Sequence, residues 1–232
     1  MTKRQIQILT EIIRKYADRA EPVGSLSLAE HFNLSPATIR YEMAELEHLG
    51  LISQPHTSSG RIPTDKGYRF YVNNLSGVQP KSRSAETINK RVDSLKDKSE
   101  KAIKIAAETL SDLTGNMALA TLDENVYFYG YNQLFSQPEL SDTFHTQLAA
   151  RFLDSLQDWL SHSFTDDNLN IFIGHENPIV KSSGLTMILS RFNSPLSESN
   201  YIGIVGSTRQ SYERVISLVD YAGKKLEKVI NK

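Results

Sequence analysis

The side chains whose type and spacing could do chemistry gather first at the start of a helical pattern. They lie within about two helical turns and are Ser35, Pro36, Ala37, Thr38, Arg40 and Tyr41. A capping serine leaves the first backbone N–H groups of a helix free to meet a phosphate oxygen. An arginine among small residues can bond a guanine edge with two hydrogen bonds or grip a phosphate. These residues therefore predict contact with DNA, and the sequence leaves both roles of Arg40 open.

A second set follows in a short polar loop and consists of His56, Thr57, Ser58, Ser59, Gly60 and Arg61. Strand patterns at 51–55 and 61–64 flank the loop, so the segment is predicted to be a β-hairpin with a polar tip. Small polar groups followed by an arginine suit a loop that lies along phosphates or enters a minor groove. We interpret this hairpin as the wing of a DNA-binding domain.

Three helical patterns must position these two sets. The first has an apolar face formed by Ile6, Leu9, Ile13 and Tyr16. The second is short and lies between a cap at Ser25 and a turn at Asn33, and the third runs to Leu49 before a stop at Gly50. This order is typical of a winged helix-turn-helix, which sets the first part of its second helix against base edges. A three-helix domain that never touches DNA has similar buried faces, so periodicity alone leaves that alternative open.

The third helix is predicted to have two distinct faces. At about 100° per residue, the inward face consists of Ile39, Met43, Leu46 and Leu49. The outward face consists of Ala37, Arg40, Tyr41, Ala44 and His48. The second face is the one we expect to approach DNA.

Two domains are predicted, divided by a polar stretch after Leu75. Residues 1–75 form the winged helix-turn-helix, residues 76–85 a linker, and residues 86–232 a second domain. The second domain opens with helical periodicity over 86–113, which predicts one long helix, and continues with short β-rich runs between helical patterns. The fold class is therefore α+β, with one mixed or antiparallel sheet.

Composition excludes several classes of function. The chain has no cysteine, which excludes disulfides, thiolate metal sites and cysteine nucleophiles. Its 6 histidines show no metal-ligand spacing, and Ser141, Asp142 and His145 lack a nucleophile elbow, so we expect no metal, no cofactor and no catalytic residue. The N-terminus lacks a secretory signal and no apolar run is long enough for a membrane span, which predicts a cytoplasmic protein without membrane contact.

The charges are unevenly distributed along the chain. Residues 1–104 carry 17 Lys and Arg against 12 Asp and Glu, whereas residues 105–232 carry 9 against 15. The first part can approach phosphate and the second would repel it. Within residues 1–75 the balance is only 9 basic against 8 acidic groups, so DNA affinity must come from individually placed charges. We therefore expect base reading to matter.

Several sequence runs resemble those of one protein family. In the first domain they are Glu21-Pro22-Val23-Gly24-Ser25, Ser35-Pro36-Ala37-Thr38-Ile39-Arg40, Met43-Ala44-Glu45-Leu46-Glu47 and the long run 54–68. In the second they are Leu134-Phe135-Ser136-Gln137-Pro138-Glu139, Ile173-Gly174-His175-Glu176-Asn177-Pro178 and the run 214–221. Together they are similar to the heat-inducible transcription repressor HrcA family over nearly the whole chain.

The resemblance implies a winged-helix domain, a GAF-like domain, and repression of chaperone operons by a homodimer on an inverted-repeat operator. It also implies a GroEL-type chaperonin as a partner. Family members usually carry an inserted dimerisation domain where this chain has only Asp123-Glu124-Asn125, so the chain resembles a short form of the family. Tyr41 and Ser207 also stand where Asn and Pro are usual. Because GAF-like domains often bind small molecules, a ligand-responsive winged-helix regulator is the alternative function.

Overall fold

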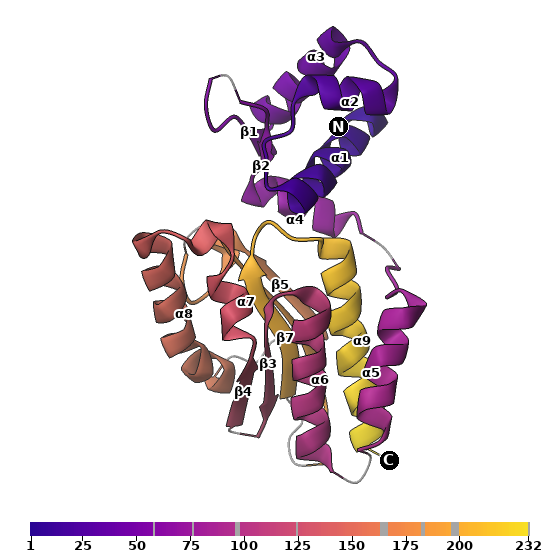
Figure 1. Cartoon of the computed structure of the whole chain (residues 1–232), viewed down its shortest axis with the longest axis vertical. Helices are drawn as coiled ribbons and strands as arrows, with labels where there is room; N and C mark the ends of the chain where they lie inside the picture. The colour runs from indigo at the N-terminus through magenta and orange to yellow at the C-terminus, as the bar shows by residue number, and fades with distance from the viewer. Residues whose placement is uncertain are drawn as a thin grey trace. The chain divides into compact units, whose positions relative to one another are not determined.

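The computed structural model describes residues 1–57, 59–75, 77–95, 98–123, 125–162, 167–181, 184–195 and 200–231. These residues form two compact units (Figure 1). The first comprises residues 1–76 together with 209–211, and the second comprises residues 77–208 and 212–232.

The first unit contains four helices and a small hairpin among its described residues. The elements are α1 (Lys3–Arg19), α2 (Ser25–Phe32), α3 (Pro36–His48), β1 (Ile52–Ser53), β2 (Ile62–Pro63) and α4 (Asp65–Asn73). β1 and β2 are antiparallel, and a single bridge between Val23 and Arg61 adds a third extended segment to the hairpin. A helix-turn-helix followed by such a hairpin is a winged helix, which confirms the predicted architecture of this unit.

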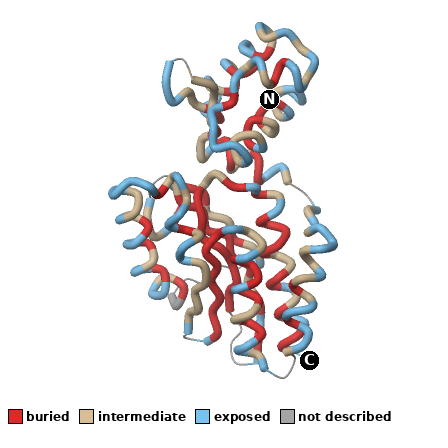
Figure 2. The backbone as a smooth tube through the Cα atoms, in the orientation of Figure 1, coloured by how far each residue is buried: buried red, intermediate tan, exposed pale blue. Residues whose placement is uncertain are grey.

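The core of this unit is built from apolar stripes of α1, α3 and α4 (Figure 2). On α1 the buried residues are Ile8, Leu9, Ile12 and Ile13. Leu9 and Ile13 were predicted to be buried, but Ile6 and Tyr16 are only half-buried because the stripe is centred on Ile8 and Ile12. The α2 cap also differs from the prediction, since Gly24 occupies the cap position and Ser25 is the first helical residue.

The second unit is built on a five-stranded sheet in which every described pairing is antiparallel. The strands are β3 (Met117–Leu122), β4 (Asn125–Tyr129), β5 (Leu169–Ile173), β6 (Leu185–Phe192) and β7 (Asn200–Ser207), in the order β4-β3-β7-β6-β5. The helices are α5 (Ser82–Asp93), α6 (Ser99–Thr114), α7 (Tyr131–Phe135), α8 (Thr143–His162) and α9 (Tyr212–Ile230). Two 3₁₀ turns, η1 (Pro138–Leu140) and η2 (Gly174–Glu176), complete the unit. The predicted α+β class is therefore confirmed.

Helical layers cover both faces of this sheet (Figure 1). α6 and α9 pack on one face, with α5 against both of them, and α8 lies on the other side. The α8 face is filled by large apolar side chains, among them Phe152, Leu156 and Met187, each fully buried. The sheet is therefore buried on both faces, against α8 on one and against α6 and α9 on the other.

The prediction of a single long helix over 86–113 is wrong, because the segment folds as two helices. α5 begins at Ser82, inside the segment expected to be a linker, and ends at Asp93. Backbone N–H groups of Leu95 and Lys98 then bond back to Val92 and Leu95 in a turn, and α6 begins at Ser99. Periodicity could not reveal this turn because the apolar spacing continues across it. Folding back allows the apolar faces of both helices to cover the same core as α9.

The connection between β3 and β4 is as short as the sequence predicted. Leu122 pairs directly with Asn125, and Asp123 adopts the left-handed conformation, with φ 56°, that tight hairpin turns need. This hairpin therefore holds no inserted domain.

Candidate nucleic-acid interface

The start of α3 is organised as the sequence predicted. Ser35 is the N-cap, and its hydroxyl oxygen accepts a hydrogen bond of 3.1 Å from the backbone N–H of Thr38. Pro36 occupies the first turn, where its missing N–H costs nothing. The Ser35 and Thr38 hydroxyl oxygens lie 2.8 Å apart, so both side chains are held at the helix start.

The two faces of α3 also follow the prediction, with one exception. The buried residues are Ile39, Glu42, Met43 and Leu46, and the exposed ones include Ala37, Arg40, Tyr41, Ala44 and His48. Leu49 was expected to face inward but is 39% exposed, because the helix ends at His48 and Leu49 only caps it.

Two of the three carboxylates of α3 are held by arginines of the same unit. Glu42 is buried and accepts a long hydrogen bond of 3.5 Å from Arg4 of α1. Glu47 forms an ion pair with Arg61. Arg40, by contrast, makes no hydrogen bond or ion pair with any residue that the structure describes. Its guanidinium is therefore available to an external acceptor.

The wing is a compact polar loop held by its own side chains. The Gln54 side-chain amide donates hydrogen bonds to the backbone oxygens of Thr57 at 2.9 Å and Ser59 at 3.1 Å. The Ser59 hydroxyl donates to the backbone oxygen of His56 at 2.7 Å and accepts from the His56 N–H at 3.0 Å. These bonds fix the loop while leaving the His56 and Thr57 side chains exposed. Ser58 lies outside the described residues.

Gly60 and Arg61 anchor the returning strand of the wing. A Cβ on Gly60 would lie 2.4 Å from the backbone carbon of Val23, so only glycine permits this close approach. Arg61 exchanges two backbone hydrogen bonds of 2.9 Å with Val23, and its Nε donates to the Glu47 carboxylate at 2.9 Å. The wing is thereby tied both to the segment before α2 and to α3.

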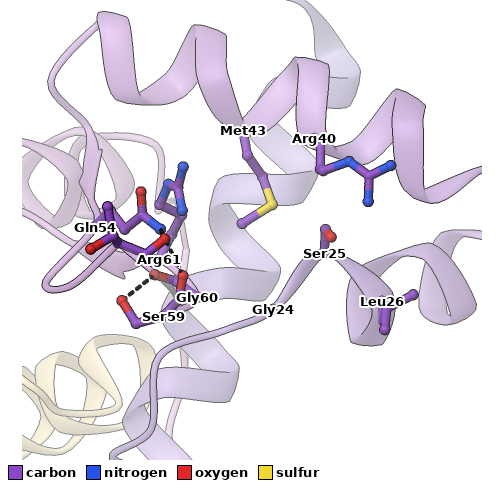
Figure 3. Close-up of a pocket in the computed structure, with 10 residues that line it drawn as sticks. Gly24, Ser25, Leu26, Arg40, Met43, Gln54, Ser59, Gly60 and Arg61 are labelled. Carbon is purple, nitrogen blue, oxygen red and sulfur yellow. Dashed lines mark hydrogen bonds between the residues drawn. The ribbon is translucent and has the colours of Figure 1, made fainter.

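Together these elements enclose a groove of about 530 Å³ (Figure 3). Its lining consists of Gly24, Ser25, Leu26, Arg40, Met43, Gln54, Thr57, Ser59, Gly60 and Arg61. Figure 3 shows Arg40, Ser25 and Leu26 at one end of the groove and the wing residues at the other, with Met43 between them.

The groove unites some of the predicted site residues and adds others. Arg40 of the helix set and Thr57, Ser59, Gly60 and Arg61 of the wing set line it together. Ser35, Pro36, Ala37, Thr38, Tyr41 and His56 are not part of its lining. Sequence reasoning missed Gln54, Leu26 and Glu47, whose roles depend on contacts across the fold. The one available signal was Gln54, a long amide placed just before a loop of small polar residues.

The remaining residues of the long run 54–68 serve the scaffold. The Thr64 hydroxyl caps α4 and donates to the Gly50 carbonyl at 2.7 Å, and the Lys66 ammonium donates to the Leu49 carbonyl at 2.8 Å. Gly67 has no room for a side chain, since a Cβ would lie 2.0 Å from the Leu51 carbonyl oxygen. α4 therefore locks the turn between α3 and β1, which fixes where α3 ends.

Other chemically interesting groups in the described part of the chain have structural explanations. Asp142 precedes α8, accepts the His145 N–H at 2.9 Å, and contacts the His145 ring through its second oxygen. Both contacts lower the pKa of the Asp142 carboxyl, and the hydrogen bond from the His145 backbone N–H has the larger effect. The arrangement is that of a helix cap. Within the described ranges, His, Asp and Glu form no group of three or more that could hold a metal, and no helix has the length and apolar character to cross a membrane.

Comparison with known proteins gives two family matches. A model described as the HrcA DNA-binding winged helix-turn-helix of a transcription repressor matches residues 1–76, and one described as the HrcA protein C-terminal domain matches residues 71–216. A "Heat-inducible transcription repressor HrcA" of Halalkalibacterium halodurans is 27% identical over 341 positions, covering 99% of this chain and 98% of the relative. Since this chain has 232 residues, part of that relative has no counterpart here.

Two further matches complete the comparison. A relative of the same name from Frankia casuarinae is 55% identical over 83 residues, which cover 35% of this chain and 24% of the relative. A crystal structure of a protein described as hypothetical has a TM-score of 0.76 and 19% identity, covering 99% of this chain and 98% of that one. The last likeness is one of fold.

Proposed function

This chain belongs to the HrcA family of heat-inducible transcription repressors, and we propose that it represses transcription by binding operator DNA through its winged helix. One observation carries the proposal. The unpaired guanidinium of Arg40 lies on the exposed face of α3, at the same groove that the wing closes on its other side. A recognition helix and a wing that share one groove can hold a base edge and the adjacent backbone at the same time.

In the proposed complex the first half of α3 enters the major groove. Arg40 bonds a base edge, Ala37 and Tyr41 contact neighbouring bases, and Ser35, Pro36 and Thr38 lie against a phosphate at the helix start. Two of the three carboxylates of α3 do not oppose this approach, because Glu42 is buried and Glu47 is paired with Arg61.

The wing is proposed to follow the sugar-phosphate backbone beside the major groove. His56, Thr57, Ser58, Ser59 and Gly60 would supply small polar groups and backbone N–H groups to phosphates. Arg61 donates one N–H to Glu47, and its other guanidinium N–H groups are the ones proposed to reach a phosphate. Gln54 has a positioning role, because its amide sets the shape of the loop.

We further propose that the active form is a homodimer on an inverted repeat, with the second unit as the pairing domain. A dimer with two-fold symmetry sets its recognition helices about 34 Å apart, or a multiple of that distance, so the half-sites must be separated by whole turns. The antiparallel order β4-β3-β7-β6-β5 between helical layers supports a GAF-like description of this domain. No catalytic step is proposed, and the cytoplasm is the proposed compartment.

The regulated genes are proposed to encode chaperones, with release of the operator on heating. A repressor of modest stability loses its folded fraction over a few degrees, and a GroEL-type chaperonin would restore it. The name shared by the relatives supports this part of the proposal.

Selection from a pool of random duplexes tests the proposal without knowledge of the operator. The expected product is an inverted repeat whose half-sites lie whole helical turns apart, bound far more tightly than a scrambled duplex. Fluorescence anisotropy with and without chaperonin then measures whether the chaperonin raises the active fraction. Failure to enrich any sequence, or enrichment of a site without symmetry, would contradict the proposed repressor.

A further inference from the structure

Strand β4 forms one edge of the sheet in the second unit and has an unpartnered outer side. It pairs with β3, from Leu122 opposite Asn125 to Ala118 opposite Tyr129. A two-residue connection makes Leu122 and Asn125 a hydrogen-bonded pair. Because such pairs alternate along an antiparallel ladder, Val126 and Phe128 direct their backbone N–H and C=O groups away from β3. No described residue hydrogen-bonds these outward groups.

This edge lacks the features by which natural sheets prevent further pairing. β4 has the sequence Asn-Val-Tyr-Phe-Tyr, without charge or proline, and its register with β3 contains no bulge. α7 follows directly and exposes Tyr131 by 47% and Phe135 by 38%, one turn apart on the same side. The Tyr131 ring lies 5.9 Å from that of Phe128, so strand and helix form one apolar surface, the β4 edge surface.

We propose that β4 pairs with β4 of a second copy of this chain, antiparallel and about a two-fold axis at Tyr127. In this register Val126 of one copy lies opposite Phe128 of the other, so each outward N–H meets a carbonyl oxygen. The two sheets then become one, and the aromatic residues of α7 extend the contact. The inference names the surface of the homodimer proposed above and rests on that part of the proposed function.

The charges beside the strand fit a second copy. Glu100 and Lys104 of α6 form an ion pair of 2.6 Å, and Glu100 also accepts a hydrogen bond of 3.1 Å from the Tyr127 hydroxyl. The Lys104 ammonium lies 4.5 Å from the centre of the Tyr127 ring. Because the two charges beside Tyr127 are already paired with each other, a second copy meets no net charge there that would oppose its approach. A strand of this length, about 17 Å, gives a small interface, so dimerisation is expected at micromolar concentrations.

Cross-linking tests the pairing register directly, since the chain contains no cysteine. Residues opposite each other in a non-hydrogen-bonded antiparallel pair have Cα atoms about 4.5 Å apart, within the range that a disulfide spans. Tyr127→Cys is therefore expected to form a covalent dimer in most molecules on mild oxidation. Tyr129→Cys is the matched control, because it lies on the same face but two residues from the axis and cannot reach its own counterpart. Absence of the Tyr127→Cys dimer, or equal cross-linking of both variants, overturns the proposed register.

A second experiment leaves the residues of β4 unchanged and alters the neighbouring helix instead. The double variant Tyr131→Glu/Phe135→Glu is expected to be monomeric by light scattering at concentrations where the wild type is dimeric. Phe144→Glu, which changes a 65% exposed aromatic residue of α8, is expected to leave the dimer intact. Unchanged fluorescence of Trp159, which packs edge-on against Phe172 beside the core, shows that the variants are folded. A dimeric double variant, or a monomeric Phe144→Glu, overturns the proposed surface.

DNA binding separates failure of this inference from failure of the proposed function. The monomeric double variant is expected to bind a single half-site like the wild type and to lose at least tenfold in affinity for the full inverted repeat. If the wild type binds no DNA but Tyr127→Cys still cross-links, the repressor proposal fails while the β4 interface stands.

Discussion

Arg40 carries the sequence-specific part of the proposed contact, because its guanidinium has no partner within the described chain and lies at the groove. Arg40→Ala is expected to weaken operator binding by about 1–3 kcal/mol and to leave scrambled DNA much less affected. Fluorescence anisotropy on both duplexes measures the difference. Arg19→Ala, which removes an exposed arginine outside the groove, is the matched control. Operator binding by Arg40→Ala that equals the wild type would remove Arg40 from the interface.

Arg61 differs from Arg40 because it is already held by Glu47 at 2.9 Å. If its remaining N–H groups bind a phosphate, Arg61→Ala weakens binding to operator and scrambled DNA by similar factors. It also lowers the slope of log affinity against log salt concentration by about one. Glu47→Gln frees the guanidinium without removing it, and is expected to leave that slope unchanged. The slopes are measured from anisotropy titrations at several salt concentrations. Equal losses for both variants with unchanged slopes would mean that Arg61 only holds the wing against α3.

At the scale of elements, α4 determines where α3, the proposed recognition helix, ends. In Gly67→Ala the new methyl carbon would lie only 2.0 Å from the Leu51 carbonyl oxygen. Because one of the two groups must move, the variant is expected to destabilise the first unit by about 1–3 kcal/mol. Glu30→Ala, which changes an exposed side chain of α2 away from this contact, is the control. Urea denaturation followed by circular dichroism measures both. A Gly67→Ala variant as stable as the control would show that α4 can shift without cost.

Helix α8 carries a pH-dependent cap. Because the folded state lowers the pKa of Asp142, the folded state binds fewer protons there than the unfolded state. The carboxylate therefore adds stability above its unfolded pKa of about 3.9, and this contribution is lost as pH falls through the lower folded value. Asp142→Ala is expected to lower the thermal midpoint at pH 7, with a gap from the wild type that closes at lower pH. Asp154→Ala, an exposed site on the same helix, should show no such gap at either pH.

At the scale of the whole molecule, the proposed response to heat can be assigned to a unit. The chain has one tryptophan, Trp159, and it packs against the core of the second unit, so its fluorescence reports that unit alone. If heat acts through the proposed pairing domain, operator release is expected to coincide with the change in Trp159 fluorescence. Anisotropy and fluorescence recorded over one temperature range test this. Release well below any change in fluorescence or circular dichroism would instead favour a ligand or partner as the signal.

The sequence by itself determined the local features of this protein. The Ser35–Pro36 helix start, the αL turn at Asn33, the outward face with Arg40, and the tight turn between β3 and β4 all follow from residue types over a few positions. Such features depend on interactions between near neighbours, which a sequence states directly.

The tertiary structure decided the contacts between distant residues. Only packing shows that Glu47 holds Arg61, that Gln54 ties the wing backbone, and that Gly60 must pass against Val23. The turn between α5 and α6 also escaped prediction, because two helices with the same apolar spacing gain more burial by folding back on one core than one long helix would. These choices depend on the free energy of burying surfaces far apart in the chain, and a local pattern does not contain that information.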